Sequence, residues 1–529
     1  MTGSIMIQGT MSNAGKSVLA GGLCRVLRQD GYKVAPFKSQ NMALNSFITR
    51  EGFEMGRAQV MQAEAAGIEP AVSMNPILLK PTNDTGSQVI INGSPVGVMS
   101  ASEYYRHKKD YIPYILDAYR RLARKYDVIV IEGAGSPAEI NLKQDDIVNM
   151  GLAELVDAPV LLAGDIDRGG VFAQLVGTIT LLEEKERQRI KGMIINKFRG
   201  DVSILKPGLT MLEERANIPV LGVVPYFHLD IDEEDSLTER FRKKSAAGLA
   251  DVAVICLPRI SNFTDVAPLE TMDEISVRYI TSPDEFGTPD AVIVPGSKNT
   301  IEDLLWMRQN GLEARIQKFA SGNGVVFGIC GGYQMMGAQI SDPEGVERKG
   351  TVRGMGLLPV RTVFGPEKRR TRVRGRFLQM SGILKELTGV EFEGYEIHMG
   401  ESRSEENVGL LVEFLEESMT EIQDSDQAAD KAEGKRGSRM GYSRVDGAQK
   451  GNIYGCYIHG IFDAPECAKG FLSAILKAKG YDTDQIQVRN WKSYKEEQYD
   501  KLADIIRESL DMERIYQIIE KGNDTPCSL

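Results

Sequence analysis

Short apolar runs alternate with segments of helical spacing along most of the chain. The apolar runs in the first half lie at 4–8, 33–37, 127–131, 159–165, 192–197 and 219–225. A second series follows at 251–256, 290–294 and 325–329. Strands that alternate with helices predict parallel sheets covered by helices on both faces. We therefore expect an α/β fold with two domains, 1–245 and 249–489, joined by the charged and then small-residue stretch 239–248.

Two segments depart from this pattern. The region from about 405 to 437 is acidic and polar, which predicts a surface insertion in the second domain without catalytic content. Residues 490–521 have the spacing of an amphipathic helix. We therefore expect 490–529 to form a helical tail that packs back on the protein.

Composition narrows the class of protein. Of the 529 residues, 42% are hydrophobic and 26% are charged, as in ordinary globular proteins. The net charge of −11 argues against a nucleic acid or an anionic membrane as a partner. Six cysteines without a Cys-X-X-Cys pair indicate reduced thiols. With no leader-like segment and no apolar run of membrane-spanning length, we expect a cytoplasmic protein.

A phosphate-binding loop is predicted between the first apolar run and a helical segment at 18–27. It reads Gly9-Thr10-Met11-Ser12-Asn13-Ala14-Gly15-Lys16-Ser17. The amides of such a loop surround phosphates, its lysine offsets their charge and its final hydroxyl holds Mg²⁺. The residues expected to bind ATP are Thr10, Asn13, Gly15, Lys16 and Ser17. Glu132, at the end of the 127–131 strand, is expected to hold Mg²⁺ together with Ser17.

The spacing of this loop is unusual. Five residues separate Gly9 from Gly15, where four are common, and Thr10 takes the usual place of the first glycine. This variant resembles the loop of dethiobiotin-synthetase-type ligases. Partition-type ATPases carry a signature lysine where this chain has Met11, which argues against that relationship.

Other polar residues follow predicted strands of the first domain. Asn196-Lys197 lies where such folds often read the nucleotide base. The runs 38–46 and 74–81 are rich in side-chain amides and lysines, and loops at the carboxyl ends of parallel strands bind ligands. They suit a substrate rich in carboxylates and amides, although capping and packing would explain them equally well. The expected substrate residues are Lys38, Gln40, Asn41, Asn75 and Lys80.

The second domain contains a candidate nucleophile. The apolar run 325–329 ends at Cys330, which glycines bracket in Gly328-Ile329-Cys330-Gly331-Gly332-Tyr333-Gln334. A strand that enters a sharp turn and then a helix presents its nucleophile at the apex, and the helix N-terminus favours the thiolate. The main-chain amides of Gly331 and Gly296 are expected to form an oxyanion hole.

A cysteine nucleophile needs a base within hydrogen-bond reach. The four histidines are His107, His228, His398 and His459. His459 has the best setting, because an apolar run carries it into a glycine turn. His398, in Gly394-Tyr395-Glu396-Ile397-His398-Met399-Gly400, is the competitor and would otherwise be structural or line the site.

The segment around Cys330, together with His459, resembles the class I glutamine amidotransferase domain. That family usually has a glutamate two residues after the histidine, whereas this chain has Ile461, so the residue that orients His459 is unassigned. The same departure occurs in the cobyric acid synthase family, which the chain resembles in further segments: 37–42, 54–59, 74–81 and 394–400.

The resemblance implies a dethiobiotin-synthetase-like ligase domain followed by an amidotransferase domain. It implies that glutamine and ATP–Mg²⁺ are used to amidate the b, d, e and g carboxylates of a corrinoid substrate, adenosylcobyrinic acid a,c-diamide, in cobalamin biosynthesis. Nothing in the residue chemistry itself names a corrin ring, and the oligomeric state stays open.

Three alternatives remain at this point. Ile461 argues against a CTP-synthase-like amidoligase, and the run 74–81 argues against a cobyrinic acid a,c-diamide synthase. A nucleotide-switched regulator with an inactive glutaminase domain would have no need to keep both Cys330 and His459.

Overall fold

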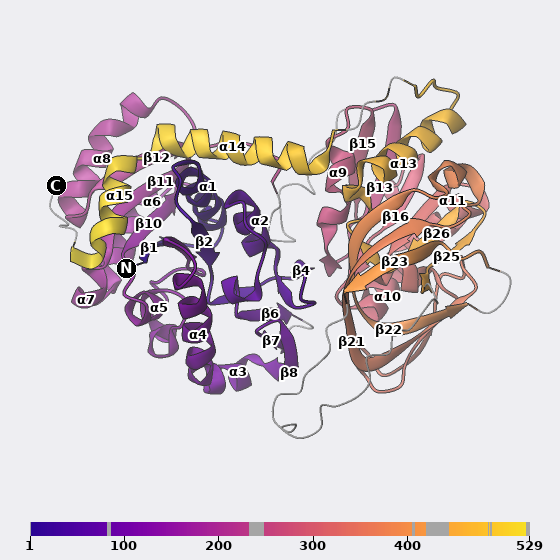
Figure 1. The fold of residues 1–529 in the computed structure, drawn as a ribbon, viewed down its shortest axis with the longest axis horizontal. Helices are drawn as coiled ribbons and strands as arrows, with labels where there is room; N and C mark the ends of the chain where they lie inside the picture. Colours follow the sequence, from indigo (N-terminus) through magenta and orange to yellow (C-terminus); the bar gives the residue numbers. More distant parts are fainter. Residues whose placement is uncertain are drawn as a thin grey trace, which may run out of the picture. The chain divides into compact units, whose positions relative to one another are not determined.

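The computed structural model describes residues 2–81, 86–231, 248–404, 408–418, 444–484, 486 and 489–524. The chain divides into two compact units (Figure 1). The first comprises Met1–Phe47, Glu54–Glu234 and Ser493–Leu529, and the second comprises Ile48–Phe53 and Asp235–Lys492. Apart from Gly248, the stretch 239–248 that was predicted as the linker lies outside the described residues.

A six-stranded parallel sheet forms the centre of the first unit. In spatial order its strands are β12 (Val220–Pro225), β11 (Ile190–Phe198), β10 (Val160–Asp165), β1 (Gly3–Gly9), β9 (Val128–Glu132) and β2 (Val34–Phe37). Apolar cores lie on both faces, because Met6 of β1 packs on one side and its neighbours Ile5 and Ile7 pack on the other. Parallel strands buried on both faces are therefore continuous apolar runs, as predicted.

Helices cover this sheet. Those within the first part of the chain are α1 (Lys16–Gln29), α2 (Arg57–Ala65), α3 (Ala101–His107), α4 (Ile112–Ala123), α5 (Met150–Leu155), α6 (Val171–Leu181), α7 (Glu184–Arg187) and α8 (Val202–Ala216).

Parts of the runs 38–46 and 74–81, expected as loops, form strands of a separate small sheet. Its order is β3 (Gln40–Met42), β6 (Ile77–Pro81), β7 (Gly86–Ile91) and β8 (Ser94–Ser100). The apolar stretch Ile77-Leu78-Leu79 is fully buried between neighbouring strands, and this burial favours extended backbone over a ligand loop.

The tail forms two helices rather than one, α14 (Trp491–Ser509) and α15 (Met512–Lys521). The break occurs at Asp511, whose carboxylate caps α15 by accepting a hydrogen bond from the main-chain nitrogen of Arg514. Residues of both helices, among them Tyr499, Ile506 and Ile518, join the apolar core that also contains α1. The tail therefore completes the first unit, and Figure 1 shows α14 along α1.

The second unit is also built on a mainly parallel sheet. Its order is β15 (Ile275–Ile280), β13 (Ala250–Ile255), β16 (Ala291–Val294), β18 (Val325–Ile329), β26 (Ile453–Cys456) and the antiparallel β25 (Ala448–Lys450). Its helices are α9 (Ala267–Glu270), α10 (Thr300–Asn310), α11 (Leu312–Ser321), α12 (Gly331–Met336) and α13 (Pro465–Ala478).

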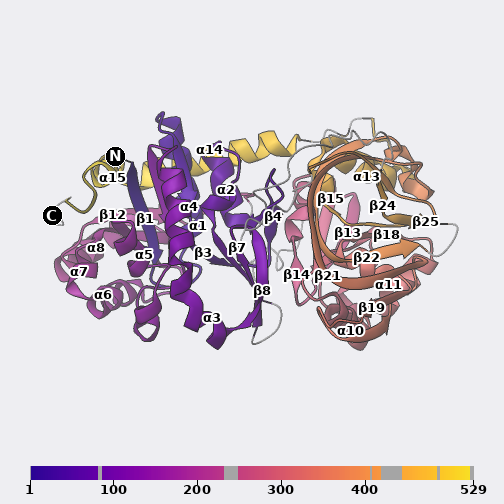
Figure 2. The same cartoon turned by 60° about the horizontal axis from the view of Figure 1, so that its bottom comes forward.

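A second sheet lies in the same unit, and its long strands β21 and β22 run side by side (Figure 2). It contains β20 (Gly350–Arg353), β19 (Gln339–Asp342), β21 (Val360–Phe377), β22 (Glu391–Ser404), β27 (Ile458–His459), β23 (Val412–Ser418) and β24 (Val445–Asp446). The prediction of a surface insertion at about 405–437 is wrong for part of that range, because β23 lies inside it and pairs with β21. Val412 and Phe414 of β23 are buried, and this apolar alternation outweighs the acidic composition around it. Residues 405–407 and 419–437 lie outside the described part of the chain.

Candidate active sites

The phosphate loop of the first unit has the conformation that anion binding requires. Asn13 and Gly15 have positive φ angles of 61° and 89°, and α1 begins immediately afterwards at Lys16. A β-carbon on Gly15 would lie 2.1 Å from the side-chain nitrogen of Asn196, and the φ of 89° would strain any larger residue there. The amides at the start of α1 therefore come directly after a tight turn, as in phosphate-binding sites.

Polar contacts within the loop hold its side chains. Lys16 Nζ donates to the main-chain oxygens of Met11, at 2.9 Å, and Gly135, at 3.0 Å. The hydroxyl of Thr10 donates to the side-chain oxygen of Gln174 at 3.1 Å. The lysine is thus held over the loop, at the end of β9.

Asn196 and Lys197, expected to read the nucleotide base, support the loop from β11. The Asn196 amide donates to the main-chain oxygen of Ala14 at 2.8 Å. Lys197 Nζ donates to the main-chain oxygen of Asn13 at 2.6 Å and to Asp165 Oδ2 at 3.0 Å. These contacts give the pair a clear structural role, and its contact with nucleotide stays a prediction.

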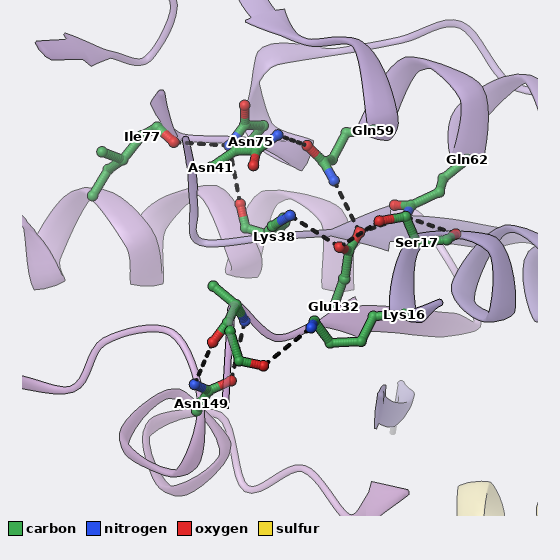
Figure 3. A network of polar contacts seen from close by, with 12 residues as sticks. Lys16, Ser17, Lys38, Asn41, Gln59, Gln62, Asn75, Ile77, Glu132 and Asn149 are labelled. Carbon is green, nitrogen blue, oxygen red and sulfur yellow. Dashed lines mark hydrogen bonds and ion pairs between the residues drawn. The ribbon is translucent and has the colours of Figure 1, made fainter. Parts of the chain in front are cut away.

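Glu132 is the centre of a buried polar network (Figure 3). Its Oε1 accepts hydrogen bonds from Ser17 Oγ at 2.8 Å and Lys38 Nζ at 2.9 Å. Its Oε2 accepts from the side-chain nitrogens of Gln62 at 2.6 Å and Gln59 at 3.2 Å. Burial raises the pKa of Glu132, but the charge of Lys38 and the hydrogen bonds outweigh burial and lower the pKa, so the carboxylate is ionised.

The residues at this point fit a magnesium ion. Ser17 and Glu132 offer adjacent oxygens, and the buried side-chain oxygen of Gln62 has no hydrogen-bond partner. Across the described ranges, no three His, Cys, Asp or Glu side chains gather as a metal cluster. Magnesium suits such a site, because it takes one or two protein oxygens and completes its shell with phosphates and water.

The expected substrate residues are held by protein groups. Asn75 accepts from the main-chain nitrogen of Gly56 and donates to the main-chain oxygens of Lys38 and Ile77. Lys80 pairs with buried Glu54 at 2.9 Å.

The remaining two are bound as well. The side chain of Asn41 donates to Gln59 at 3.0 Å, and Gln40 accepts from the hydroxyl of Tyr104 at 2.7 Å. All of these residues thus help to build the frame around Glu132 and the small sheet, and their contact with substrate stays a prediction.

In the second unit, β18 ends as predicted at Cys330, which has the rare dihedral angles φ 52° and ψ −109°. Such backbone strain at a turn is typical of a nucleophile. The glycines around it are required by packing. A β-carbon on Gly332 would lie 1.9 Å from the main-chain oxygen of Val294 in β16.

His459 lies beside this cysteine and is oriented by a residue that the sequence did not reveal. Its Nδ1 lies 2.7 Å from Asp265 Oδ2, and Asp265 Oδ1 accepts from the main-chain nitrogen of Gly460 at 2.9 Å. Asp265 belongs to a 3-10 turn, Phe263–Val266, and all these groups are buried. It therefore takes the place left open by Ile461, from 194 residues away in the sequence.

The charge of this pair follows from its surroundings. Burial lowers the pKa of His459, but the charges of Asp265 and Cys330, together with hydrogen bonds to both, raise it to about 10. The protonated imidazole of His459 is thus the favoured form. The ring also stacks on Tyr395, with centroids 5.3 Å apart.

The two predicted oxyanion residues lie next to these groups. A β-carbon on Gly296 would be 3.2 Å from His459 Cε1, and one on Gly331 would be 2.9 Å from the main-chain nitrogen of Ser297. Main-chain amides of the 296–297 strand and of the α12 start are therefore close together near Cys330.

A further polar group adjoins Gly331. The hydroxyl of Thr300 lies 3.2 Å from the side-chain oxygen of Gln334 and 3.3 Å from Glu347 Oε1. Glu347 Oε2 also accepts from the main-chain nitrogen of Ile301 at 3.1 Å. Burial raises the pKa of Glu347 to about 8. No motif in the sequence points to Glu347.

His398 has a different setting from His459. Its ring stacks on Tyr457, with centroids 3.6 Å apart, and its Nδ1 lies 3.1 Å from the main-chain oxygen of Gly400. Its Nε2 lies 3.8 Å from Glu396, a fully buried carboxylate that Arg444 binds with both Nη atoms at 2.8 and 2.7 Å. His398 therefore belongs to an ionic cluster with buried Glu396 and Arg444.

Two family models match this chain. Residues 5–236 match the family described as "CobQ/CobB/MinD/ParA nucleotide binding domain", and residues 251–467 match the "CobB/CobQ-like glutamine amidotransferase domain". No helix in the described part of the chain is long and apolar enough to cross a membrane.

Curated relatives match over nearly the whole chain. A cobyric acid synthase of Ruminiclostridium cellulolyticum is 58% identical, over 99% of this chain and 98% of that protein. Those of Lachnoclostridium phytofermentans and Clostridium acetobutylicum are 57% and 52% identical, over 99% and 97% of this chain and 100% and 98% of their own lengths. The chain belongs to the cobyric acid synthase family.

Proposed function

We propose that this enzyme uses ATP and ammonia from glutamine to amidate the b, d, e and g carboxylates of adenosylcobyrinic acid a,c-diamide, giving adenosylcobyric acid. One observation carries the proposal. A single chain holds a thiol beside a buried histidine–aspartate pair in one unit and a phosphate loop beside a buried carboxylate in the other. Family membership supplies the corrinoid substrate.

In the second unit, Cys330 is proposed to attack the side-chain amide carbon of glutamine. A carbon–sulfur bond forms, the carbon–nitrogen bond breaks, and His459 gives its proton to the leaving ammonia. Amides of Gly296 and Gly331 stabilise the oxyanion, and water then hydrolyses the thioester to glutamate. Asp265 keeps His459 protonated and oriented.

Glu347 is proposed to bind the α-ammonium group of glutamine. Thr300 has one hydroxyl proton, yet the acceptor oxygens of Gln334 and Glu347 both lie within 3.3 Å of it. An ammonium group would donate to these acceptor oxygens and favour ionised Glu347. The Thr300 hydroxyl also lies next to Gly331, the residue that follows the nucleophile Cys330.

In the first unit, the loop amides and Lys16 are proposed to hold the ATP phosphates. Ser17 and Glu132 would hold Mg²⁺, which neutralises phosphate charge when bound. The substrate carboxylate takes the γ-phosphoryl group and becomes an acyl phosphate, because a carboxylate anion is a poor electrophile. Ammonia then attacks the acyl carbon and releases phosphate, which leaves an amide.

Mass spectrometry tests this function. The protein is incubated with adenosylcobyrinic acid a,c-diamide, ATP, Mg²⁺ and glutamine, and conversions of carboxylate to amide are counted. Four conversions are expected, and Cys330→Ala should reach them only with added ammonia. Intact glutamine hydrolysis and ATP hydrolysis without any conversion would refute the corrinoid substrate and leave the two half-reactions standing.

A further inference from the structure

The two oxygens of Glu132 are used in different ways. Oε2 is held by Gln59 and Gln62, two amides from the same helix, α2. Oε1 is shared by Ser17 and Lys38. Oε2 is therefore held by two neutral amides, whereas Oε1 accepts from the hydroxyl of Ser17, at the end of the phosphate loop, and from the ammonium group of Lys38.

The pair formed by Ser17 and Glu132 Oε1 needs no rearrangement when a metal binds. Ser17 Oγ and Glu132 Oε1 lie 2.8 Å apart. Neighbouring ligands of octahedral Mg²⁺, each about 2.1 Å from the ion, are separated by about 3 Å. The two oxygens already have the spacing of one edge of such an octahedron.

The contact between Lys38 and Oε1 does need rearrangement. Lys38 Nζ lies 2.9 Å from the same Oε1 that would bind the ion, and both groups are buried. Two cations on one carboxylate oxygen repel each other strongly away from water. The main chain of Lys38 is pinned, because its nitrogen donates to the Met74 oxygen and its oxygen accepts from Asn75. Only the side chain is therefore able to move.

We propose that Lys38 is an internal counter-ion of the metal site, which neutralises Glu132 without metal and leaves Oε1 when Mg²⁺ binds there. The inference rests on the proposed Mg²⁺ site at Ser17 and Glu132.

A matched pair of buried salt bridges allows a clean test. Lys80 Nζ lies 2.9 Å from Glu54, and the exposed fractions of these side chains, 5% and 0%, resemble those of Lys38 and Glu132, 7% and 1%. Lys38→Met and Lys80→Met thus each leave one buried carboxylate without its lysine. Only the first carboxylate is proposed to bind a metal.

The measurement is Mn²⁺ affinity by electron paramagnetic resonance, with a saturating non-hydrolysable ATP analogue. Lys38→Met is expected to bind Mn²⁺ at least tenfold more tightly than the wild type, because no cation must leave, whereas Lys80→Met should match the wild type. Thermal unfolding gives a second readout. Mg²⁺ with the analogue should raise the melting temperature of Lys38→Met more than that of the other two proteins.

Each remaining outcome is decisive. Equal or weaker Mn²⁺ binding by Lys38→Met, with binding retained by the wild type, overturns the counter-ion role alone. Absence of Mn²⁺ binding by the wild type overturns both the role and the proposed metal site. Should Lys38→Met not fold, Lys38→Gln replaces it, since its amide donates to Oε1 without a positive charge, and the same tenfold gain is required.

Discussion

Replacing Asp265 with asparagine should slow glutamine hydrolysis while leaving ammonia-dependent amidation unchanged. The carboxylate accepts two hydrogen bonds, from His459 at 2.7 Å and from the main-chain nitrogen of Gly460 at 2.9 Å. Asparagine has a single oxygen, so its NH₂ group must face one of these donors. The imidazolium also loses the anion that stabilises it.

The structure sets the size of this effect. A hydrogen bond to a charged group contributes about 1.5–3 kcal/mol, which corresponds to about 10- to 150-fold in kcat/KM at 1.36 kcal/mol per factor of ten. The pKa of His459, about 10, also depends on this carboxylate. Because an anion favours the protonated imidazole, its removal lowers the pKa. The basic limb of the pH profile for glutamine hydrolysis should therefore move to lower pH.

Glutamate release and ammonia-dependent amidation are measured across pH for the wild type, Asp265→Asn and Asp251→Asn. Asp251 is the matched control, because it also binds a cation, Arg278, with both oxygens at 2.8 Å. It lies near the start of β13 rather than at the carboxyl end of that strand. The control should lose less than twofold. A loss below threefold for Asp265→Asn, or an unmoved basic limb, would refute the role of Asp265.

Four other substitutions test further features of the chain. Glu347→Gln should raise KM for glutamine about tenfold or more and leave ammonia-dependent activity unchanged. In the wild type, glutamine binding should strengthen as pH rises through about 8, the pKa of the Glu347 carboxyl. A KM for glutamine that does not change with pH would contradict this role. Gly332→Ala should destabilise the protein by more than about 2 kcal/mol in calorimetry, since its β-carbon would lie 1.9 Å from a main-chain oxygen. The control is Gly177→Ala in α6, which has open space around it and should stabilise the protein by about 0.5 kcal/mol. Arg444→Met should lower stability by about 2 kcal/mol by removing a partner of buried Glu396. Burial raises the pKa of the Glu396 carboxyl, but its hydrogen-bonding partners and the charge of Arg444 lower it to about 2, below the unfolded value. The stability that Glu396 contributes is therefore present above about pH 4.3 and is lost as pH falls towards 2. Equal melting temperatures of the wild type and Arg444→Met at pH 7 would contradict this stabilising role.

Local signals in the sequence predicted much of the fold and part of the sites. The strand before Cys330 and the loop before Lys16 were identified because a continuous apolar run, glycines and a functional side chain lie within about ten residues. Asp265 gave no such signal, because it approaches His459 only through the tertiary fold. Sequence spacing cannot reveal a contact of that kind without an expectation about the fold.

Composition misled where packing decides the structure. The acidic character of residues 405–437 concealed β23, whose buried Val412 and Phe414 pair it with β21. The amides of the 38–46 run suggested an open binding loop, yet Asn41 is buried and bound to Gln59. In both cases the polar residues are of types that are common at the protein surface. Their position is nevertheless determined by the burial of neighbouring side chains.

The tail has a consequence for the order in which the protein is made. α14 and α15 supply buried side chains to the core around α1, but they are translated after the whole second unit. At about 5–20 residues per second, the roughly 270 residues between α8 and α14 take about 15–55 s to synthesise. The nascent first unit must wait that long with part of its core exposed, so a chain that stops early yields no complete ATP-using unit. A finished first unit therefore always comes with the glutamine-hydrolysing unit that supplies its ammonia.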